Sequence, residues 1–187
     1  MDFNLHPVST LFQITGLPRS GTAFISTMFS LERDCIGLHE EGAENRNWKN
    51  TIDELLRRYE FVADCTTYGF LPKASRPESV KVYLNKDPEL SRSECQERFK
   101  YEIPFGSFDQ LKVIADRWAI DNNALVIEAK DLFNTSSLKK IWDHCFDGMR
   151  LFPEEKVSRL VTMNIQRQNP ENVFSIENGR QLIKEVI

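Results

Sequence analysis

The segment from Leu11 to Arg33, LFQITGLPRSGTAFISTMFSLER, restricts the fold of this chain more than any other part of its sequence. Its first five residues form an apolar run, which is typical of a strand buried in a parallel sheet. A loop with two glycines and a proline follows, and apolar residues at nearly helical spacing predict a helix over residues 22–33. A strand, a glycine-containing loop and a helix in this order predict a loop that binds phosphate groups.

The rest of the chain continues to alternate between strands and helices. We predict further strands at residues 35–42, 61–71, 79–86 and 123–132, and further helices at 50–61, 88–102, 108–121, 134–146 and 153–166. This alternation is typical of an α/β fold, so we expect three layers, α/β/α, around a mainly parallel sheet. A chain of 187 residues also has the length of one domain, and we predict that residues 1–187 form a single one.

Polar residues follow the end of each predicted strand. The first strand ends at the glycine loop, and the others end near residues 39–41, 64–68, 86 and 130–131. Ligands of parallel α/β folds bind beyond the carboxyl ends of the strands. We therefore expect these polar clusters to lie around one crevice.

The glycine loop has the spacing of a nucleotide-binding loop but lacks its lysine. Gly16 and Gly21 are spaced as in G-x-x-x-x-G-K-[ST], yet Thr22 follows Gly21 directly, and the nearby cation, Arg19, lies inside the loop. Backbone N–H groups at the start of a helix bind anions, and Ser20, Thr22 and Arg19 add side-chain donors. The loop therefore predicts a site for a terminal phosphate or sulfate held without a metal ion. The alternative is a tight strand-to-helix turn with an exposed arginine.

The composition argues against several classes of partner. The net charge of −4 gives no general attraction to nucleic acid or to an anionic membrane. No apolar run approaches the roughly 20 residues of a membrane-spanning helix, and the first residues, MDFNLHPVSTLF, lack the pattern of a signal peptide. The cysteines form no C-x-x-C pair and lie among apolar residues, which predicts reduced, mostly buried thiols and a cytoplasmic location.

Several segments of the chain resemble one protein family, in the same order. Residues 16–24, GLPRSGTAF, resemble the 5′-phosphosulfate loop of sulfotransferases that use 3′-phosphoadenosine 5′-phosphosulfate (PAPS), usually P-[RK]-S-G-T-[TS]. Weaker resemblances follow at 63–71, 82–94, 126–145 and 148–165. The resemblance covers a core of about residues 11–165 and leaves a C-terminal tail of about 166–187. The chain is shorter than typical members and lacks the glycine-rich C-terminal motif of the cytosolic branch, so it resembles a short, divergent member.

The resemblance implies a P-loop NTPase-like fold and a specific reaction. The enzyme would transfer a sulfuryl group from PAPS to a hydroxyl or amine acceptor, release 3′-phosphoadenosine 5′-phosphate (PAP) and need no metal. The 5′-phosphosulfate would be held by Pro18, Arg19, Ser20, Gly21, Thr22 and Ala23. Arg19 would also neutralise the charge that develops on the bridging oxygen during transfer.

Three residues, Lys86, Arg92 and Ser93, are the candidates for holding the 3′-phosphate of the donor, where the family has an arginine followed by a serine. Aligning the Asp-Pro pair places Lys86 at the arginine position and Glu94 at the serine position. Aligning Ser93 instead places Asn85 at the arginine position, and a one-residue shift would reconcile Lys86 with Ser93. The alternative is a solvated strand end and helix start without a ligand.

The reaction benefits from a general base that takes the proton of the acceptor. The segment LHEEGAE follows the second predicted strand, where the tyrosine-sulfating branch of the family carries a glutamate. We favour Glu40 as the base, with His39 and Glu41 as alternatives and a solvated acidic turn as the non-catalytic interpretation. Asp64 and Thr66 either orient the acceptor or cap a turn.

The expected acceptor is a small molecule, peptide or glycan with a hydroxyl group. Aromatic residues would either line its pocket or belong to the core: Tyr68, Phe105, Phe108 and Trp118. A second subunit that completes a reduced substrate lid would make the protein a homodimer. Two rival functions are a nucleotide- or anion-binding interaction module without catalysis, and a P-loop kinase-like enzyme that binds ATP with Mg²⁺.

Overall fold

The computed structural model describes residues 9–40, 48–74, 76–100 and 107–163 of the chain. The strands and helices follow one another along these residues in the order that the sequence predicts. The strands are β1 (Thr10–Gly16), β2 (Cys35–His39), β3 (Phe61–Thr67), β4 (Val80–Asn85) and β5 (Leu125–Glu128). The helices are α1 (Thr22–Phe29), α3 (Trp48–Leu56), α4 (Pro88–Phe99), α5 (Ser107–Asp121), the 3₁₀ helix η1 (Ala129–Asp131), α6 (Thr135–Phe146) and α7 (Glu154–Thr162).

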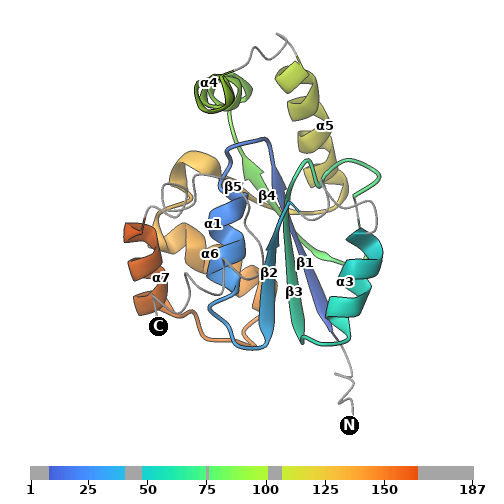
Figure 1. The fold of residues 1–187 in the computed structure, drawn as a ribbon, viewed down its shortest axis with the longest axis vertical. Helices are drawn as coiled ribbons and strands as arrows, with labels where there is room; N and C mark the ends of the chain where they lie inside the picture. Colours follow the sequence, from blue (N-terminus) through green and yellow to red (C-terminus); the bar gives the residue numbers. More distant parts are fainter. Residues whose placement is uncertain (1–8, 41–47, 75, 101–106, 164–187) are drawn as a thin grey trace.

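The strands form one sheet in which every neighbouring pair runs parallel, in the order β2-β3-β1-β4-β5. Helices α1, α6 and α7 cover one face of the sheet, and α3 and α5 cover the other (Figure 1). The predicted α/β architecture, with three layers around a parallel sheet, is confirmed for the described residues.

Some elements end earlier than the sequence predicts. Helix α1 ends at Phe29, because the chain then turns through hydrogen bonds from Leu31 N–H to Met28 O and from Glu32 N–H to Phe29 O. Strand β5 ends at Glu128, and η1 follows directly. The predicted positions that lie outside the described residues are 41–42, 101–102 and 164–166, together with the C-terminal tail at 166–187.

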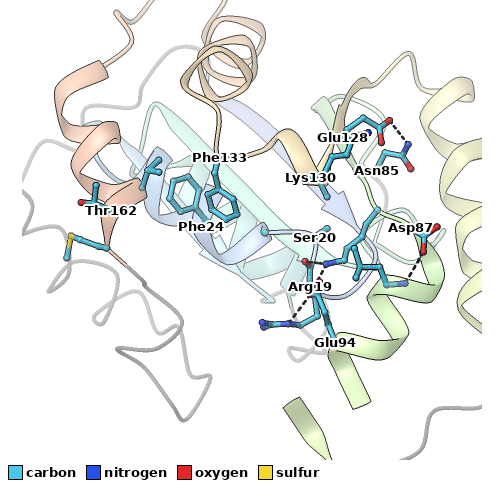
Figure 2. Close-up of a pocket in the computed structure, with 16 residues that line it drawn as sticks. Arg19, Ser20, Phe24, Asn85, Asp87, Glu94, Glu128, Lys130, Phe133 and Thr162 are labelled. Atoms are coloured by element: carbon cyan, nitrogen blue, oxygen red, sulfur yellow. Dashed lines mark hydrogen bonds and ion pairs between the residues drawn. The ribbon is translucent and has the colours of Figure 1, made fainter. Parts of the chain in front are cut away.

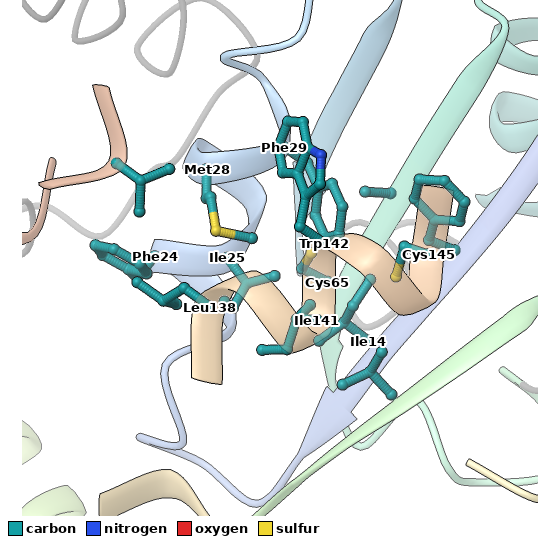
Figure 3. Packing of buried hydrophobic residues seen from close by; sticks show 14 of the residues in the cluster. Ile14, Phe24, Ile25, Met28, Phe29, Cys65, Leu138, Ile141, Trp142 and Cys145 are labelled. Carbon is teal, nitrogen blue, oxygen red and sulfur yellow. The ribbon is translucent and has the colours of Figure 1, made fainter. Parts of the chain in front are cut away.

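An aromatic cluster holds α1 and α6 on the same face of the sheet. The ring centroids of Phe12 in β1 and Phe146 in α6 are 5.1 Å apart, and those of Trp142 and Phe146 are 4.5 Å apart. Phe29 of α1 stacks on Trp142 at 5.9 Å (Figure 3). All four rings are fully buried. Because α1 begins where the glycine loop ends, this packing also positions the end of the loop.

The opposite face contains the aromatic residues that the sequence offers for an acceptor pocket. Phe108 and Trp118 of α5 are buried, and they pack with Leu17 and Tyr83. Tyr68 is partly buried and packs against the same cluster. Phe108 and Trp118 are therefore core residues, which was one of the two interpretations. Phe105 lies outside the described residues.

The cysteine thiols are buried, as predicted. The four residues concerned, none of them in a disulfide, are Cys35, Cys65, Cys95 and Cys145. Burial raises the pKa of each of these thiols. Because the thiolate is the reactive form, these cysteines are suited to packing rather than to chemistry.

The strand order reverses at β1, in the middle of the sheet. The chain passes from β1 through α1 to β2, returns to β3 on that side, and then crosses to β4 and β5 on the other side. Ligands of open α/β sheets bind outside the carboxyl ends of the strands at such a reversal. The glycine loop follows β1 directly, so the topology favours a ligand site at this loop.

A buried glutamine ties β1 to the connection between β3 and β4. Gln13 is 1% exposed, and its amide nitrogen donates to the carbonyl oxygens of Gly69 at 3.2 Å and of Ala74 at 2.6 Å. Its amide oxygen accepts from the backbone N–H of Arg76 and from the hydroxyl of Ser79, each at 3.4 Å. One side chain therefore makes four hydrogen bonds to this connection.

We expect Gln13→Ala to lower the free energy of unfolding by about 2 kcal/mol, because several buried polar groups lose their partner at once. Gln110 on α5 is exposed and provides the matched control. Gln110→Ala should change the stability by less than about 0.5 kcal/mol. Urea unfolding followed by circular dichroism measures both variants. Equal stability of the two would mean that the amide of Gln13 does not hold this connection.

Candidate functional site

The loop between β1 and α1 requires glycine at two positions. A Cβ atom at Gly16 would lie 2.5 Å from Oγ of Ser20 and 2.6 Å from the carbonyl oxygen of Leu84. Gly21 has a φ of +102°, and a Cβ atom there would lie 2.2 Å from Cδ2 of Leu132. The G-x-x-x-x-G spacing is therefore explained by close packing of the loop on β4 and on the segment that follows β5.

Ser20 carries a buried hydroxyl inside this loop. The residue is 3% exposed, and its Oγ has no hydrogen-bond partner among the residues that the structure describes. Ser20 also lines the large cavity beside the loop. A buried hydroxyl without a hydrogen bond is destabilising, so an oxygen atom of a bound anion would stabilise it.

The cavity has a volume of about 820 Å³, within the range of about 300 to 1,000 Å³ that is typical of sites for small ligands. Its lining includes residues 19–21 after β1, 85–87 at the end of β4, 128–130 at the end of β5 and 161–163 at the end of α7, together with Phe24, Leu90, Glu94 and Phe133 (Figure 2). The polar clusters that follow β1, β4 and β5 thus meet around one crevice, as expected. Those that follow β2 and β3 are not among the described residues that line it.

The two ends of the cavity differ in chemistry. Arg19 and Ser20 lie at one end, where Nζ of Lys86 reaches the carbonyl oxygen of Arg19 (Figure 2). At the other end, Phe24 of α1 and Phe133 form an edge-to-face pair whose ring centroids are 5.1 Å apart (Figure 2). Cations at one end and an aromatic wall at the other suit a ligand that has both an anionic group and a planar ring.

The charged groups that line the cavity, within the described residues, are Arg19, Lys86 and Lys130 together with Asp87, Glu94 and Glu128. Asp87 caps the N-terminus of α4. Glu128 accepts a hydrogen bond from Nδ2 of Asn85 at 2.7 Å. Glu94 lies 2.7 Å from Nζ of Lys86. Cations and carboxylates are therefore balanced in number, and pairs between them decide how much positive charge a ligand meets.

Two side chains hold the glycine loop from the β4 side. Nζ of Lys86 donates to the carbonyl oxygen of Arg19 at 2.8 Å, and Oγ of Ser91 donates to that of Pro18 at 2.5 Å. Lys86 is 7% exposed and Ser91 is fully buried. Lys86 was predicted as a phosphate ligand; its contact with the loop, and the whole role of Ser91, were missed from the sequence. The sequence offered one signal for Ser91, namely its position in the first turns of α4, just after the cap at Asp87.

The other residues predicted for the 3′-phosphate are not brought to the cavity. Arg92 pairs with Oε1 of Glu89 at 2.9 Å, and Ser93 is exposed on α4. Neither is among the described residues that line the cavity. Asn85, the alternative to Lys86, does line it. The cavity therefore brings together Lys86 and the loop, but not Arg92 or Ser93.

The predicted base lies at the carboxyl end of β2. Oε1 of Glu40 accepts from the backbone N–H of Thr67 at 3.0 Å and from the Thr67 hydroxyl, and it lies 3.6 Å from Nδ1 of His39. Thr67 is the parallel-sheet partner of Gly16, so Glu40 is tied to the strand end beside the glycine loop. Glu40 also has a φ of +61°, which is unusual for a residue with a side chain. Glu41 lies outside the described residues.

The remaining candidates are buried. Thr22 and Ala23 form the first turn of α1 and do not line the cavity within the described part of the chain. Asp64 and Thr66 lie in β3, where the Thr66 hydroxyl donates to Oδ1 of Asp64 at 2.5 Å. Asp64 is 1% exposed, so an acceptor could reach it only if the neighbouring side chains moved.

Metals, membranes and relatives provide no further assignment. Within the described ranges, no group of three or more His, Cys, Asp or Glu side chains is arranged to hold a metal ion. No described helix has the length and apolar character needed to cross a membrane. Comparisons with protein-family models, with curated proteins and with solved structures found no match for this chain.

Proposed function

We propose that the protein is a sulfotransferase with a P-loop NTPase-like fold that uses PAPS as its donor. The observation that carries the proposal is the buried hydroxyl of Ser20, without a described partner, beside Arg19 at a helix N-terminus that opens on a cavity of about 820 Å³. The loop offers groups that bind a terminal anion but lacks the lysine that reaches a γ-phosphate. The resemblance of residues 16–24 to a 5′-phosphosulfate loop supports the same donor.

In this proposal the cavity holds the whole donor. The 5′-phosphosulfate binds the N–H groups at the start of α1, the hydroxyl of Ser20 and the guanidinium of Arg19. The adenine packs on the wall formed by Phe24 and Phe133, because aromatic side chains stack on the planar faces of bases. The 3′-phosphate binds the ammonium group of Lys86 at the polar end of the cavity.

The proposed reaction uses these groups together with Glu40. The acceptor hydroxyl attacks the sulfur atom, the bond from sulfur to the bridging oxygen breaks, and PAP leaves with that electron pair. Arg19 stabilises the charge that develops on the bridging oxygen. Glu40, held by Thr67, takes the acceptor proton. A cytoplasmic location, and a second subunit that completes the substrate lid, belong to the same proposal.

One observation favours a second candidate, a nucleotide- or anion-binding module without catalysis. His39 and Glu40 are not among the described residues that line the cavity. The proposed base and the proposed donor site are thus separate groups of residues. Tight binding of PAP without turnover of PAPS would favour this second candidate.

Calorimetric titration with PAP, AMP, ADP and ATP plus Mg²⁺ tests the proposal. We expect PAP to bind at least about tenfold more tightly than AMP, which differs only in lacking the 3′-phosphate. Arg19→Ala should weaken PAP binding by about tenfold to a hundredfold, since a charge-assisted contact is lost. Arg33→Ala, at an exposed position after α1, is the control and should bind as the wild type does. Tighter binding of ATP with Mg²⁺ than of PAP would favour the kinase-like alternative. If none of these nucleotides bound, the sulfotransferase proposal and the kinase-like alternative would both be contradicted.

A further inference from the structure

One carboxylate already occupies the cationic end of the cavity. Oε2 of Glu94 on α4 lies 2.7 Å from Nζ of Lys86 and 3.9 Å from Nε of Arg19 (Figure 2). Lys86 and Arg19 are two of the cations that line the cavity in the described part of the chain. A single carboxylate oxygen therefore faces both groups that the proposed function assigns to the anionic ligand.

We propose that Glu94 is a built-in competitor of the anionic ligand, so that an anion binds Lys86 and Arg19 only by displacing this carboxylate. The inference rests on the proposed anion site and adds a control of that site by the protein itself. It also explains why a glutamate at this position is compatible with an anion-binding cavity.

The geometry around Lys86 indicates that the carboxylate of Glu94, and not the ammonium group of Lys86, moves when an anion binds. The side chain of Lys86 is 8% exposed and is also bonded to the carbonyl oxygen of Arg19, so the ammonium group is fixed. A buried cation without a counter-ion is strongly destabilising, and a carboxylate or a bound anion must therefore neutralise it. The side chain of Glu94 is 35% exposed and can rotate toward solvent. When an oxygen atom of the ligand displaces the Glu94 carboxylate, Lys86 has an anionic partner both before and after the exchange.

This competition sets a threshold for ligands. Every anion must displace the same carboxylate, so the cost is the same for each of them. Inorganic phosphate or sulfate has only the cations and the loop to offset this cost. A nucleotide also gains contact with Phe24 and Phe133 at the other end of the cavity. Glu94 therefore lowers the affinity for nucleotides and small anions by the same factor and leaves their ratio unchanged, so a nucleotide still binds at concentrations at which the small anions no longer do.

The variant Glu94→Gln tests the inference by calorimetric titration with inorganic pyrophosphate and with PAP. Glutamine keeps an oxygen that accepts a hydrogen bond from Lys86 but removes the negative charge. We expect both ligands to bind about tenfold more tightly than to the wild type, by the same factor, because the displaced charge is common to them. Glu89→Gln, on the same helix but 79% exposed and paired with Arg92, is the control and should leave both affinities unchanged.

Stability provides a second readout that does not depend on a nucleotide. We expect Glu94→Gln to unfold at a lower urea concentration than the wild type, because Lys86 loses its counter-ion, and pyrophosphate to restore more stability to the variant than it adds to the wild type. Glu94→Asp, which retains the charge on a shorter side chain, should lie between the two. Unchanged or weaker pyrophosphate binding by Glu94→Gln would overturn the inference, as would the absence of binding to every variant. If PAP binds the wild type no better than AMP while Glu94→Gln still binds pyrophosphate more tightly, the donor assignment fails and the competition by Glu94 holds.

Discussion

Replacing Gly37 with alanine is expected to lower the free energy of unfolding by about 3 kcal/mol or more, because the added methyl group collides with backbone. A Cβ atom at Gly37 would lie 1.8 Å from the carbonyl oxygen of Ser26 and 2.6 Å from its carbonyl carbon. The N–H of Gly37 also donates to Oγ of Ser30 at 3.0 Å, and that hydroxyl donates to Ser26 O. Helix α1 thus lies directly on β2, and only a movement of the whole helix would make room.

Gly148→Ala is the control for Gly37→Ala. It shows how much free energy of unfolding a Gly→Ala substitution costs in a left-handed backbone conformation when the added methyl group meets no other atom. Gly148 has a φ of +77°, but a Cβ atom there would meet nothing within 4 Å. We expect Gly148→Ala to cost only about 1 to 2 kcal/mol. Urea unfolding of both variants, compared with the wild type, measures the difference. If Gly37→Ala were as stable as Gly148→Ala, the close approach of α1 to β2 would be wrong.

The consequence of Gly37→Ala also extends to the candidate site. Helix α1 begins at Thr22, directly after the glycine loop, and its eight residues are all buried. A shift of this helix also displaces Gly21, whose position beside Leu132 leaves no space for a side chain. We therefore expect any folded fraction of the variant to bind PAP more weakly than the wild type does.

The strands and helices could be predicted because burial leaves a local pattern in the sequence. β1 and β3 are buried on both faces, so nearly every residue in them is apolar or small, and the run is visible without knowledge of the fold. The end of α1 was predicted too late, because Leu31 continues the apolar spacing although the chain has already turned toward β2. Periodicity detects which face is buried, not where a turn interrupts it.

The contacts behind the glycine loop could not be predicted, because they join distant parts of the chain. Lys86 reaches the carbonyl oxygen of Arg19, 67 residues earlier, and Ser91 reaches that of Pro18, 73 residues earlier. The first contact depends on where β4 ends, and the second on the angle at which α4 leaves that end. The sequence indicated which residues of α4 were polar, whereas the direction of the helix decided that Ser91 and Glu94, rather than Ser93, face the loop.

The largest effect on turnover is expected from Glu40→Gln. If Glu40 takes the acceptor proton, its loss should reduce turnover by about a hundredfold to ten-thousandfold. The variant should fold normally, because the amide oxygen of glutamine can still accept from the N–H of Thr67, as Oε1 of Glu40 does at 3.0 Å. Release of PAP from PAPS, with an acceptor selected by screening hydroxyl compounds, measures the turnover.

Donor binding distinguishes a lost base from a damaged site. Glu40 is not among the described residues that line the cavity, so Glu40→Gln should bind PAP with the affinity of the wild type. His39→Gln is the matched comparison, because Nδ1 of His39 lies 3.6 Å from the same carboxylate and is the alternative base. A large loss in Glu40→Gln with a small loss in His39→Gln assigns the proton transfer to the glutamate. The reverse order would assign it to the histidine, and wild-type turnover in both would remove this strand end from the reaction.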